Sequence, residues 1–344
     1  LQLIPAFLIF LFGLINIFGI RPDLTVRYIG FFIAGLIFFV VIKLLRINIQ
    51  FIRSNATALY WIFIIILGIT LYFGVDVNGS RRWFDIFLFR FQPSEFMKIF
   101  FIIFLSNMFA KYQAYKQRNT IFLLTLLYTI IPFFLIYRQP DLGTATVFLA
   151  IFMIMAFLSP IPKKHLSIFL GGIIAILPLL WFIMHDYQRD RIIGFLDPAH
   201  DVSDTTYNMT QAIISIGSGN LMGNGLGLGT QSQLYFLPEY HTDFAFSSFI
   251  EQFGFIGGFI LIILYLIFFL FLFFRMMHYA NHKDELGKFN YYYLVGFSAF
   301  LIFQTCVNIG MNLGLLPIAG ITLPFISYGG SSLITLMIGL ALLP

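Results

Sequence analysis

Long apolar runs, separated by short polar segments, fill almost the entire chain and decide which folds it can adopt. Of its 344 residues, 60% are hydrophobic and 10% are charged, whereas soluble domains carry about 25% charged residues. A membrane-spanning helix needs about 20 consecutive apolar residues. The sequence therefore predicts an all-α polytopic membrane protein and excludes a soluble enzyme with a single anchor.

Ten of the runs are long enough for a transmembrane helix. The predicted helices are 3–20, 28–45, 58–75, 95–110, 120–137, 142–158, 166–185, 245–274, 290–313 and 323–343. The eighth exceeds the usual length, so we expect it to tilt or to extend beyond the bilayer. A large loop, 186–244, separates the seventh and eighth helices. We predict a single transmembrane domain over 1–344 that contains this loop.

Positively charged residues mark one side of the predicted protein. Lys and Arg gather in the segments 43–53, 111–118, 163–164 and 275–288, and short loops rich in these residues stay in the cytoplasm. We therefore expect both termini to be cytoplasmic and loop 186–244 to face outside. Because the cations are spread over short loops, the net charge of +5 does not indicate a nucleic-acid partner.

Ionisable side chains gather where the large loop enters the eighth run. Glu239, His241 and Asp243 lie there, and ionisable groups kept at the edge of hydrocarbon are functional candidates. Asp243 could accept a proton from a sugar hydroxyl, or hold a divalent cation such as Mg²⁺ or Mn²⁺. It could also simply cap the eighth helix. His241 has no second His or Cys nearby, which indicates a hydrogen-bonding residue rather than a zinc ligand.

Two opposite charges open the fourth predicted helix. Glu95 and Lys98 follow Pro93, and their spacing of three places them on one face of a helix, where they can pair. Mutual neutralisation would let both sit at the membrane edge. A purely structural helix would do as well with two leucines, so we expect the pair to line a cavity.

Three further residues are candidates for substrate binding. Arg82 could contact lipid headgroups, or it could clamp a diphosphate, whose oxygens match its forked N–H donors. Trp83 could be an interface anchor or a platform on which a sugar stacks. Asp141 is predicted as the N-cap of the sixth helix, and it could add negative charge to the same outer cavity.

The glycine-rich segment Gly217–Thr230 does not indicate a nucleotide cofactor. It lacks the lysine of a phosphate-binding loop and has no βαβ context. We expect its glycines to let a loop bend back over the outer surface. The preceding residues 207–216 mix polar and apolar positions, as a short interfacial helix does.

Glycine and proline interrupt the last two runs. The segments Asn308–Pro317 and Leu323–Ser332 contain several of these residues. Such residues are tolerated in a span where protein or a cavity satisfies the backbone again. Packing alone could account for them, and a cavity wall is the alternative.

At these motifs the chain resembles the SEDS family, the shape, elongation, division and sporulation proteins. The similar segments follow the family order along nearly the whole chain: Asn78–Trp83, Gln92–Lys98, Gln139–Thr144, Gly229–Leu234, Leu237–Phe246 and Asn308–Ser332. The fourth segment and the start of the last resemble the elongation branch (RodA) more than the division branch (FtsW).

The resemblance implies a ten-helix protein that polymerises lipid II into glycan strands at the outer face of the bacterial cytoplasmic membrane, releasing undecaprenyl diphosphate. It implies a class B penicillin-binding protein as partner, and other membrane proteins of the elongation complex. The essential aspartate of the family matches Asp243, and its Trp, Glu and Lys match Trp83, Glu95 and Lys98. Three alternatives stay open: a lipid II flippase, an FtsW-like division polymerase and an inactive scaffold. The polar residues concentrate on the outer side, which favours chemistry over transport.

Overall fold

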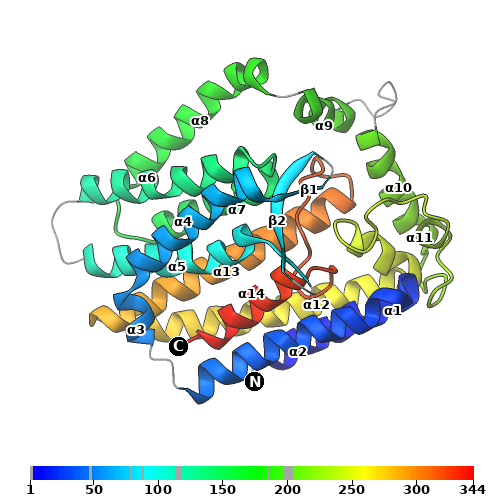
Figure 1. Ribbon diagram of the computed structural model, residues 1–344, viewed down its shortest axis with the longest axis horizontal. Coiled ribbons are helices and arrows are strands. Elements are labelled where there is room, and N and C mark those ends of the chain that lie inside the picture. The colour runs from blue at the N-terminus through cyan, green and yellow to red at the C-terminus, as the bar shows by residue number, and fades with distance from the viewer. Residues whose placement is uncertain are drawn as a thin grey trace. The chain divides into compact units, whose positions relative to one another are not determined.

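The computed structural model describes residues 3–45, 49–77, 79–86, 89–112, 118–184, 186–196 and 204–344. Asn78, part of a motif above, lies outside these ranges. Helices make up most of the described chain (Figure 1). They are α1 (Leu3–Ile20), α2 (Pro22–Leu44), α3 (Ile49–Ser54), α4 (Ala56–Phe73), α5 (Pro93–Tyr112), α6 (Arg118–Tyr137), α7 (Leu142–Phe157), α8 (Lys163–Ile183), α9 (Asp186–Leu196), α10 (Asp204–Ser218), α11 (Thr230–Gln233), α12 (Ala245–Ala280), α13 (Glu285–Asn312) and α14 (Gly330–Ala341).

The helices confirm the predicted fold class. Among the described residues, seven helices are long and apolar enough to cross a membrane: α1, α2, α4, α5, α6, α12 and α13. Two shorter apolar helices, α7 and α14, occupy the sixth and tenth predicted runs, and α8 occupies the seventh. The protein is therefore an α-helical integral membrane protein, while the count of ten crossings stays a prediction.

Internal contacts divide the chain into two compact units. The first contains Leu1–Ile29, Ser167–Phe268 and Gln304–Gly329, and the second contains Gly30–Leu166, Phe269–Phe303 and Gly330–Pro344. Each unit therefore joins segments that are far apart in the sequence. A single domain over the whole chain stays a prediction.

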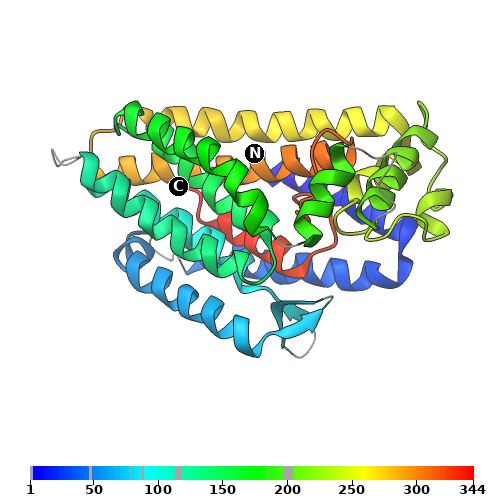
Figure 2. The same cartoon turned by 90° about the horizontal axis from the view of Figure 1, so that it is seen from above.

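Helix α5 is the buried centre of the second unit. It packs against α4, α6, α7 and α14. In its most apolar stretch, 89% of the residues are buried, compared with 28% in that of α4. Even so, α5 contains Glu95 and Lys98. Helix α4 leads into the strands at its C-terminal end (Figure 2, blue and cyan).

A small antiparallel sheet follows α4, in a segment for which the sequence predicts no element. It contains β1 (Val75–Val77), β2 (Ser80–Ile86) and β3 (Phe89–Phe91), in the order β1-β2-β3. Val75 is the partner of Trp83 on one side, and Phe84 is the partner of Phe91 on the other. The sheet places Arg82 and Trp83 next to each other on its central strand.

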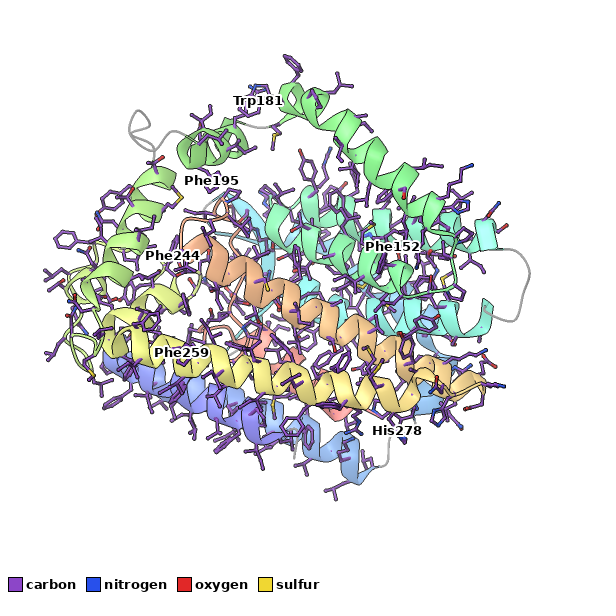
Figure 3. The ribbon with its side chains drawn as sticks, turned by 180° about the vertical axis from the view of Figure 1, so that it is seen from behind. Phe152, Trp181, Phe195, Phe244, Phe259 and His278 are labelled. Atoms are coloured by element: carbon purple, nitrogen blue, oxygen red, sulfur yellow. The ribbon has the colours of Figure 1, made fainter. Side chains whose placement is uncertain are left out.

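The eighth predicted helix continues beyond its predicted run to Ala280 and is interrupted within it, while its tilt stays a prediction. Helix α12 has 36 residues and changes direction at Gly254, where φ is 68° and ψ is −172°. Such angles suit glycine alone, and a Cβ at Gly254 would lie 2.3 Å from the backbone nitrogen of Gly223. Phe244 precedes the first part of α12, and Phe259 lies in the second (Figure 3).

The tenth helix begins later than the sequence predicts. Instead of starting at residue 323, α14 starts at Gly330, and residues 323–329 are non-helical with a turn at 324–326. The hydroxyl of Tyr28 donates to the carbonyl of Phe325 at 2.5 Å, and that of Tyr265 donates to the carbonyl of Pro324. Buried side chains thus satisfy the non-helical backbone, as is required within a membrane.

Candidate active site

The main chain at Asp243 and at the two residues before it is fixed through three successive carbonyls. The carbonyl of His241 accepts from the amide of Tyr328 at 2.8 Å. The carbonyl of Thr242 accepts from the hydroxyl of Ser327 at 2.5 Å. That of Asp243 accepts from the side chains of Asn308 and Asn312, at 2.9 and 3.1 Å. Three consecutive peptide groups are thus held by residues more than 60 positions away in the sequence.

The two asparagines share one face of α13, because residues four apart lie one turn apart. Both are fully buried. The amide of Asn308 also donates to the carbonyl of Ile321 at 2.6 Å. The side-chain Oδ1 of Asn312 accepts from the main-chain amide and the hydroxyl of Ser247, at 3.0 and 2.6 Å. One helix therefore organises the residues before α12, the first turn of α12 and the segment after α13.

The side chain of Asp243 is half-buried, and it lies beside Gly320. A Cβ at Gly320 would lie 3.5 Å from Oδ2 of Asp243, and φ at this glycine is +64°. A glycine here leaves room next to the carboxylate, and its conformation disfavours any larger residue. The site therefore presents a carboxylate on a fixed backbone, which suits a proton acceptor.

Aromatic side chains surround His241. Its ring centroid is 5.3 Å from that of Tyr240 and 5.9 Å from that of Tyr328. Burial lowers the pKa of His241 below its ordinary value of 6.5, an effect that the charge of Glu239 partly opposes and that of Arg21 reinforces. The imidazole is therefore neutral at pH 7. Glu239 is exposed, and its Oε2 accepts from the hydroxyl of Thr242 at 2.7 Å.

A second cluster lies on α5, in the other unit. Nζ of Lys98 is 2.6 Å from Oε1 of Glu95, which confirms the predicted pair. Lys98 is fully buried, Glu95 is 5% exposed, and Nζ lies 4.8 Å from the ring centroid of Phe300. Oε2 of Glu95 has no hydrogen-bond partner within the described ranges. An ion pair buried to this degree is costly to desolvate, and a functional role for it stays a prediction.

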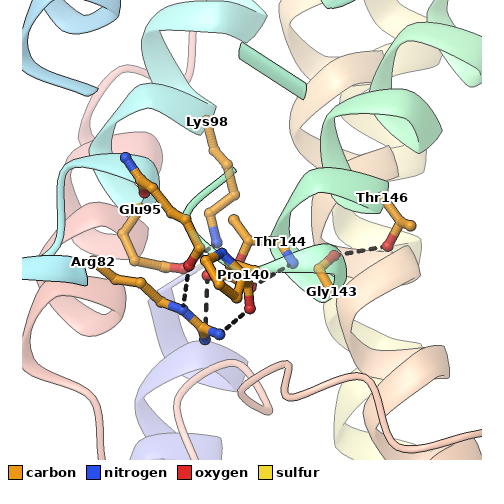
Figure 4. Close-up of polar contacts among 9 residues, drawn as sticks. Arg82, Glu95, Lys98, Pro140, Gly143, Thr144 and Thr146 are labelled. Carbon is orange, nitrogen blue, oxygen red and sulfur yellow. Dashed lines mark hydrogen bonds and ion pairs between the residues drawn. The ribbon is translucent and has the colours of Figure 1, made fainter. Parts of the chain in front are cut away.

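Arg82 binds the turn between α6 and α7 (Figure 4). Its Nε donates to the carbonyl of Gln139 at 3.1 Å, its Nη2 donates to that of Pro140, and its Nη1 is 3.7 Å from Oδ2 of Asp141. Trp83 is half-buried next to it. The guanidinium thus ties β2 to this turn, an anchoring role beyond the two uses predicted from the sequence.

Asp141 is the N-cap of α7, as the sequence predicts. Its Oδ1 accepts from the amide of Thr144 at 3.1 Å, and it is 4% exposed. The structure thus brings Arg82 to Asp141 and Glu95 to Lys98. That Trp83, Glu95 and Lys98 are neighbours of Asp243 in one cavity stays a prediction.

Sequence reasoning missed two features of the site. Asn308 and Asn312 are predicted only as part of an interrupted span, whereas their side chains bind the main-chain carbonyl of Asp243. Glu251 is fully buried within α12, and it is not among the predicted site residues. A charged residue inside an apolar run is itself a signal of function, so the sequence contained the clue.

Asp243 is the residue near which a metal ion would need ligands. Across the described ranges, no group of three or more His, Cys, Asp and Glu side chains could hold a metal by itself. Mg²⁺ is commonly held by one or two carboxylates together with substrate phosphates and water. A single carboxylate at residue 243 fits such a shared site.

Comparison with known proteins places this chain in a family. Residues 8–344 match the family described as cell cycle protein, FtsW/RodA/SpoVE. The peptidoglycan glycosyltransferase MrdB of Escherichia coli is 38% identical over 315 residues, which cover 91% of this chain and 82% of that protein. A probable peptidoglycan glycosyltransferase FtsW of Francisella salina is 37% identical over 321 residues, covering 91% and 77%.

Solved structures agree with this placement. A chain of a peptidoglycan synthase complex that coordinates polymerization and crosslinking has a TM-score of 0.83 and 28% identity, covering 99% of this chain and 95% of that one. The rod shape determining protein RodA of Thermus thermophilus has a TM-score of 0.73 and 27% identity, covering 99% and 94%. The chain is therefore a member of the FtsW/RodA/SpoVE family, as the motifs around Asp243 predict.

Proposed function

We propose that the protein is a peptidoglycan glycosyltransferase that polymerises lipid II into glycan strands. Relatives named peptidoglycan glycosyltransferase, which align with about nine-tenths of the chain, support this activity. The observation that carries the site assignment is the fixed backbone of Asp243. Its carbonyl is held by two buried asparagines, and its carboxylate lies beside Gly320.

In the proposed reaction, Asp243 is the general base. Its carboxylate takes the proton of the 4-hydroxyl group on the acceptor sugar as that oxygen attacks the anomeric carbon of the donor. The new glycosidic bond forms while the bond from that carbon to the diphosphate breaks, and undecaprenyl diphosphate leaves with the electron pair. A single displacement without a protein nucleophile inverts the anomeric centre. General-base catalysis contributes about 10²–10⁴-fold.

The other candidate residues have proposed roles in binding. Lys98, already paired with Glu95, contributes positive charge towards the departing diphosphate. Arg82 adds charge from the 139–141 turn, where Asp141 orients it. Trp83 offers a face on which a sugar stacks, and the neutral His241 is a hydrogen-bonding group.

We also propose that Asp243 and the substrate diphosphate hold a divalent cation, Mg²⁺ or Mn²⁺, between them. Such an ion, when bound, supplies positive charge to the leaving group. The fit rests on the single carboxylate at residue 243, and no nucleotide cofactor is required.

The setting follows from charge and from the relatives. The cationic loops favour cytoplasmic termini and an active site outside the cytoplasmic membrane. A structural neighbour in a complex that polymerises and crosslinks peptidoglycan supports a class B penicillin-binding protein as partner, together with other elongation-complex membrane proteins. Similarity to MrdB favours a role in elongation and cell shape. Nearly equal identity to FtsW makes division the second candidate, and complementation of cells depleted of either protein separates the two.

The proposal is tested with purified protein, lipid II and the partner transpeptidase, with and without Mg²⁺ or Mn²⁺. Asp243→Asn keeps the clamp, because both asparagines bind the main-chain carbonyl and not the carboxylate. We expect wild-type protein to form glycan polymer and Asp243→Asn to lose most of that activity. Transfer of lipid II across vesicles without polymer would indicate a flippase. Polymer formation that does not depend on this chain would indicate a scaffold.

A further inference from the structure

The interruption at Gly254 leaves a short first helix in α12, and this helix lies directly after Asp243. It begins at Ala245 and ends before Gly254. A helix of so few turns has little stability in isolation. Contacts with other segments must therefore hold it in place, and they determine where Asp243 lies.

The glycine-rich loop supplies the backbone hydrogen bonds that the interruption removes. Two amides of the loop donate to the last carbonyls of the first helix, and two loop carbonyls accept from the first amides of the second helix. The four bonds are Asn224 to Glu251 (2.9 Å), Gly225 to Gln252 (3.1 Å), Phe255 to Asn220 (2.9 Å) and Ile256 to Leu221 (3.2 Å), donor first. A Cβ at Gly223 would lie 2.1 Å from the carbonyl oxygen of Gln252, so only glycine permits this approach.

Glu251 adds the side-chain part of the same attachment. It is fully buried, and its carboxylate accepts four hydrogen bonds. Oε1 accepts from the amide of Gln231 at 2.7 Å, and Oε2 accepts from the amide of Ser232 at 3.2 Å, its hydroxyl at 2.6 Å and the hydroxyl of Ser215 at 3.2 Å. Backbone amides only donate, so both side-chain oxygens at residue 251 must accept. A Cβ at Gly229 would lie 2.6 Å from Oε2, so the loop can come this close only with glycine there.

We infer that Glu251 is a positioning residue for Asp243. Its carboxylate fastens the 229–233 turn and α10 to the short helix, and that helix fixes the C-terminal side of Asp243 while Asn308 and Asn312 hold its carbonyl. Glu251 acts through this helix and does not touch the substrate. The inference rests on the proposed function, because it assumes that Asp243 is the base. A displacement of about 1 Å at a reacting group can lower the rate about 100-fold.

Glu251→Gln is the sharpest test, because it preserves the size of the side chain. Each carboxylate oxygen accepts from at least one backbone amide. Whichever way the new amide group turns, its NH₂ therefore meets an N–H donor. We expect kcat for lipid II polymerisation to fall at least tenfold, while the KM for lipid II stays within twofold. Asp284→Asn, on the exposed 281–284 turn, is the matched control and should leave both values unchanged.

Ser232→Ala tests the same attachment by a milder route. It removes the 2.6 Å hydroxyl donor to Glu251. Because both residues belong to one attachment, the double variant should lose less activity than the product of the two single losses. If Glu251→Gln does not fold, Ser232→Ala alone must still lower kcat with KM unchanged.

The outcomes separate this inference from the proposed function. If Asp243→Asn is inactive and both Glu251→Gln and Ser232→Ala keep the wild-type kcat, the positioning role is wrong and the base assignment stands. A rise in KM with kcat unchanged, or multiplicative losses in the double variant, would also overturn it. If Asp243→Asn polymerises lipid II at the wild-type rate, the base assignment itself fails.

Discussion

Replacing Asn312 with alanine removes the side chain that joins α13 to the carbonyl of Asp243 and to Ser247 in the first turn of α12. The amide of Ser247, in the first turn of α12, loses its acceptor at 3.0 Å. A buried donor left without a partner costs about 1–3 kcal/mol. The carbonyl of Asp243 keeps its other bond, from Asn308 at 2.9 Å. We therefore expect a loss of about 2 kcal/mol in the free energy of unfolding, together with at least a tenfold fall in polymerisation rate.

Unfolding by sodium dodecyl sulfate, followed in detergent micelles, measures the stability change, and polymer formed from lipid II measures the rate. Asn290→Ala is the matched control. Asn290 also lies on α13 and is 7% exposed, but its Oδ1 accepts no hydrogen bond from the described part of the chain. We expect that control to lose less than about 1 kcal/mol. Equal stability and activity for Asn312→Ala and the wild type would refute the role assigned to the asparagines.

Two further predictions concern the charged residues. Lys98→Leu leaves the carboxylate of Glu95 buried without its partner, so stability should fall by about 3–5 kcal/mol. The double variant Glu95→Leu/Lys98→Leu should recover most of that stability in the same unfolding assay without recovering polymerisation, whereas recovery of both would mean a purely structural pair. The lowered pKa of His241 means that the unfolded chain binds a proton that the folded protein does not. The contribution of His241 to the free energy of unfolding should therefore be fully present above pH 6.5 and decrease as the pH falls below that value. Thermal midpoints measured at pH 7.5 and 5.5 should show a smaller decrease in His241→Gln, and an equal decrease would contradict the assignment.

Hydropathy and short-range spacing predict the parts of this structure that depend on neighbours in sequence. The apolar runs match the helices within a few residues, except at the starts of α2, α13 and α14 and at the end of α12. The pairing of Glu95 with Lys98 follows from their spacing of three on one helix. The cap at Asp141 follows from its place before an apolar run. In each case the partners are within one turn of each other, so the sequence pattern contains the geometry.

The parts that the sequence does not predict depend on distant partners. Gly254, Gly257 and Gly258 stand close together, yet only Gly254 has a positive φ, because the glycine-rich loop contacts the chain at that point. The bond between Asn308 and Asp243 joins residues 65 positions apart. The sheet after α4 is also unexpected, since its strands are short and mix charged with aromatic residues.

The rate of lipid II polymerisation by purified Asp243→Asn, relative to the wild type at equal amounts of folded protein, tests the central claim most directly. The clamp on the main-chain carbonyl should survive this substitution, so the variant should fold like the wild type. A general base contributes about 10²–10⁴-fold, and we predict a loss of at least about 100-fold. A rate within twofold of the wild type would show that Asp243 is not the base.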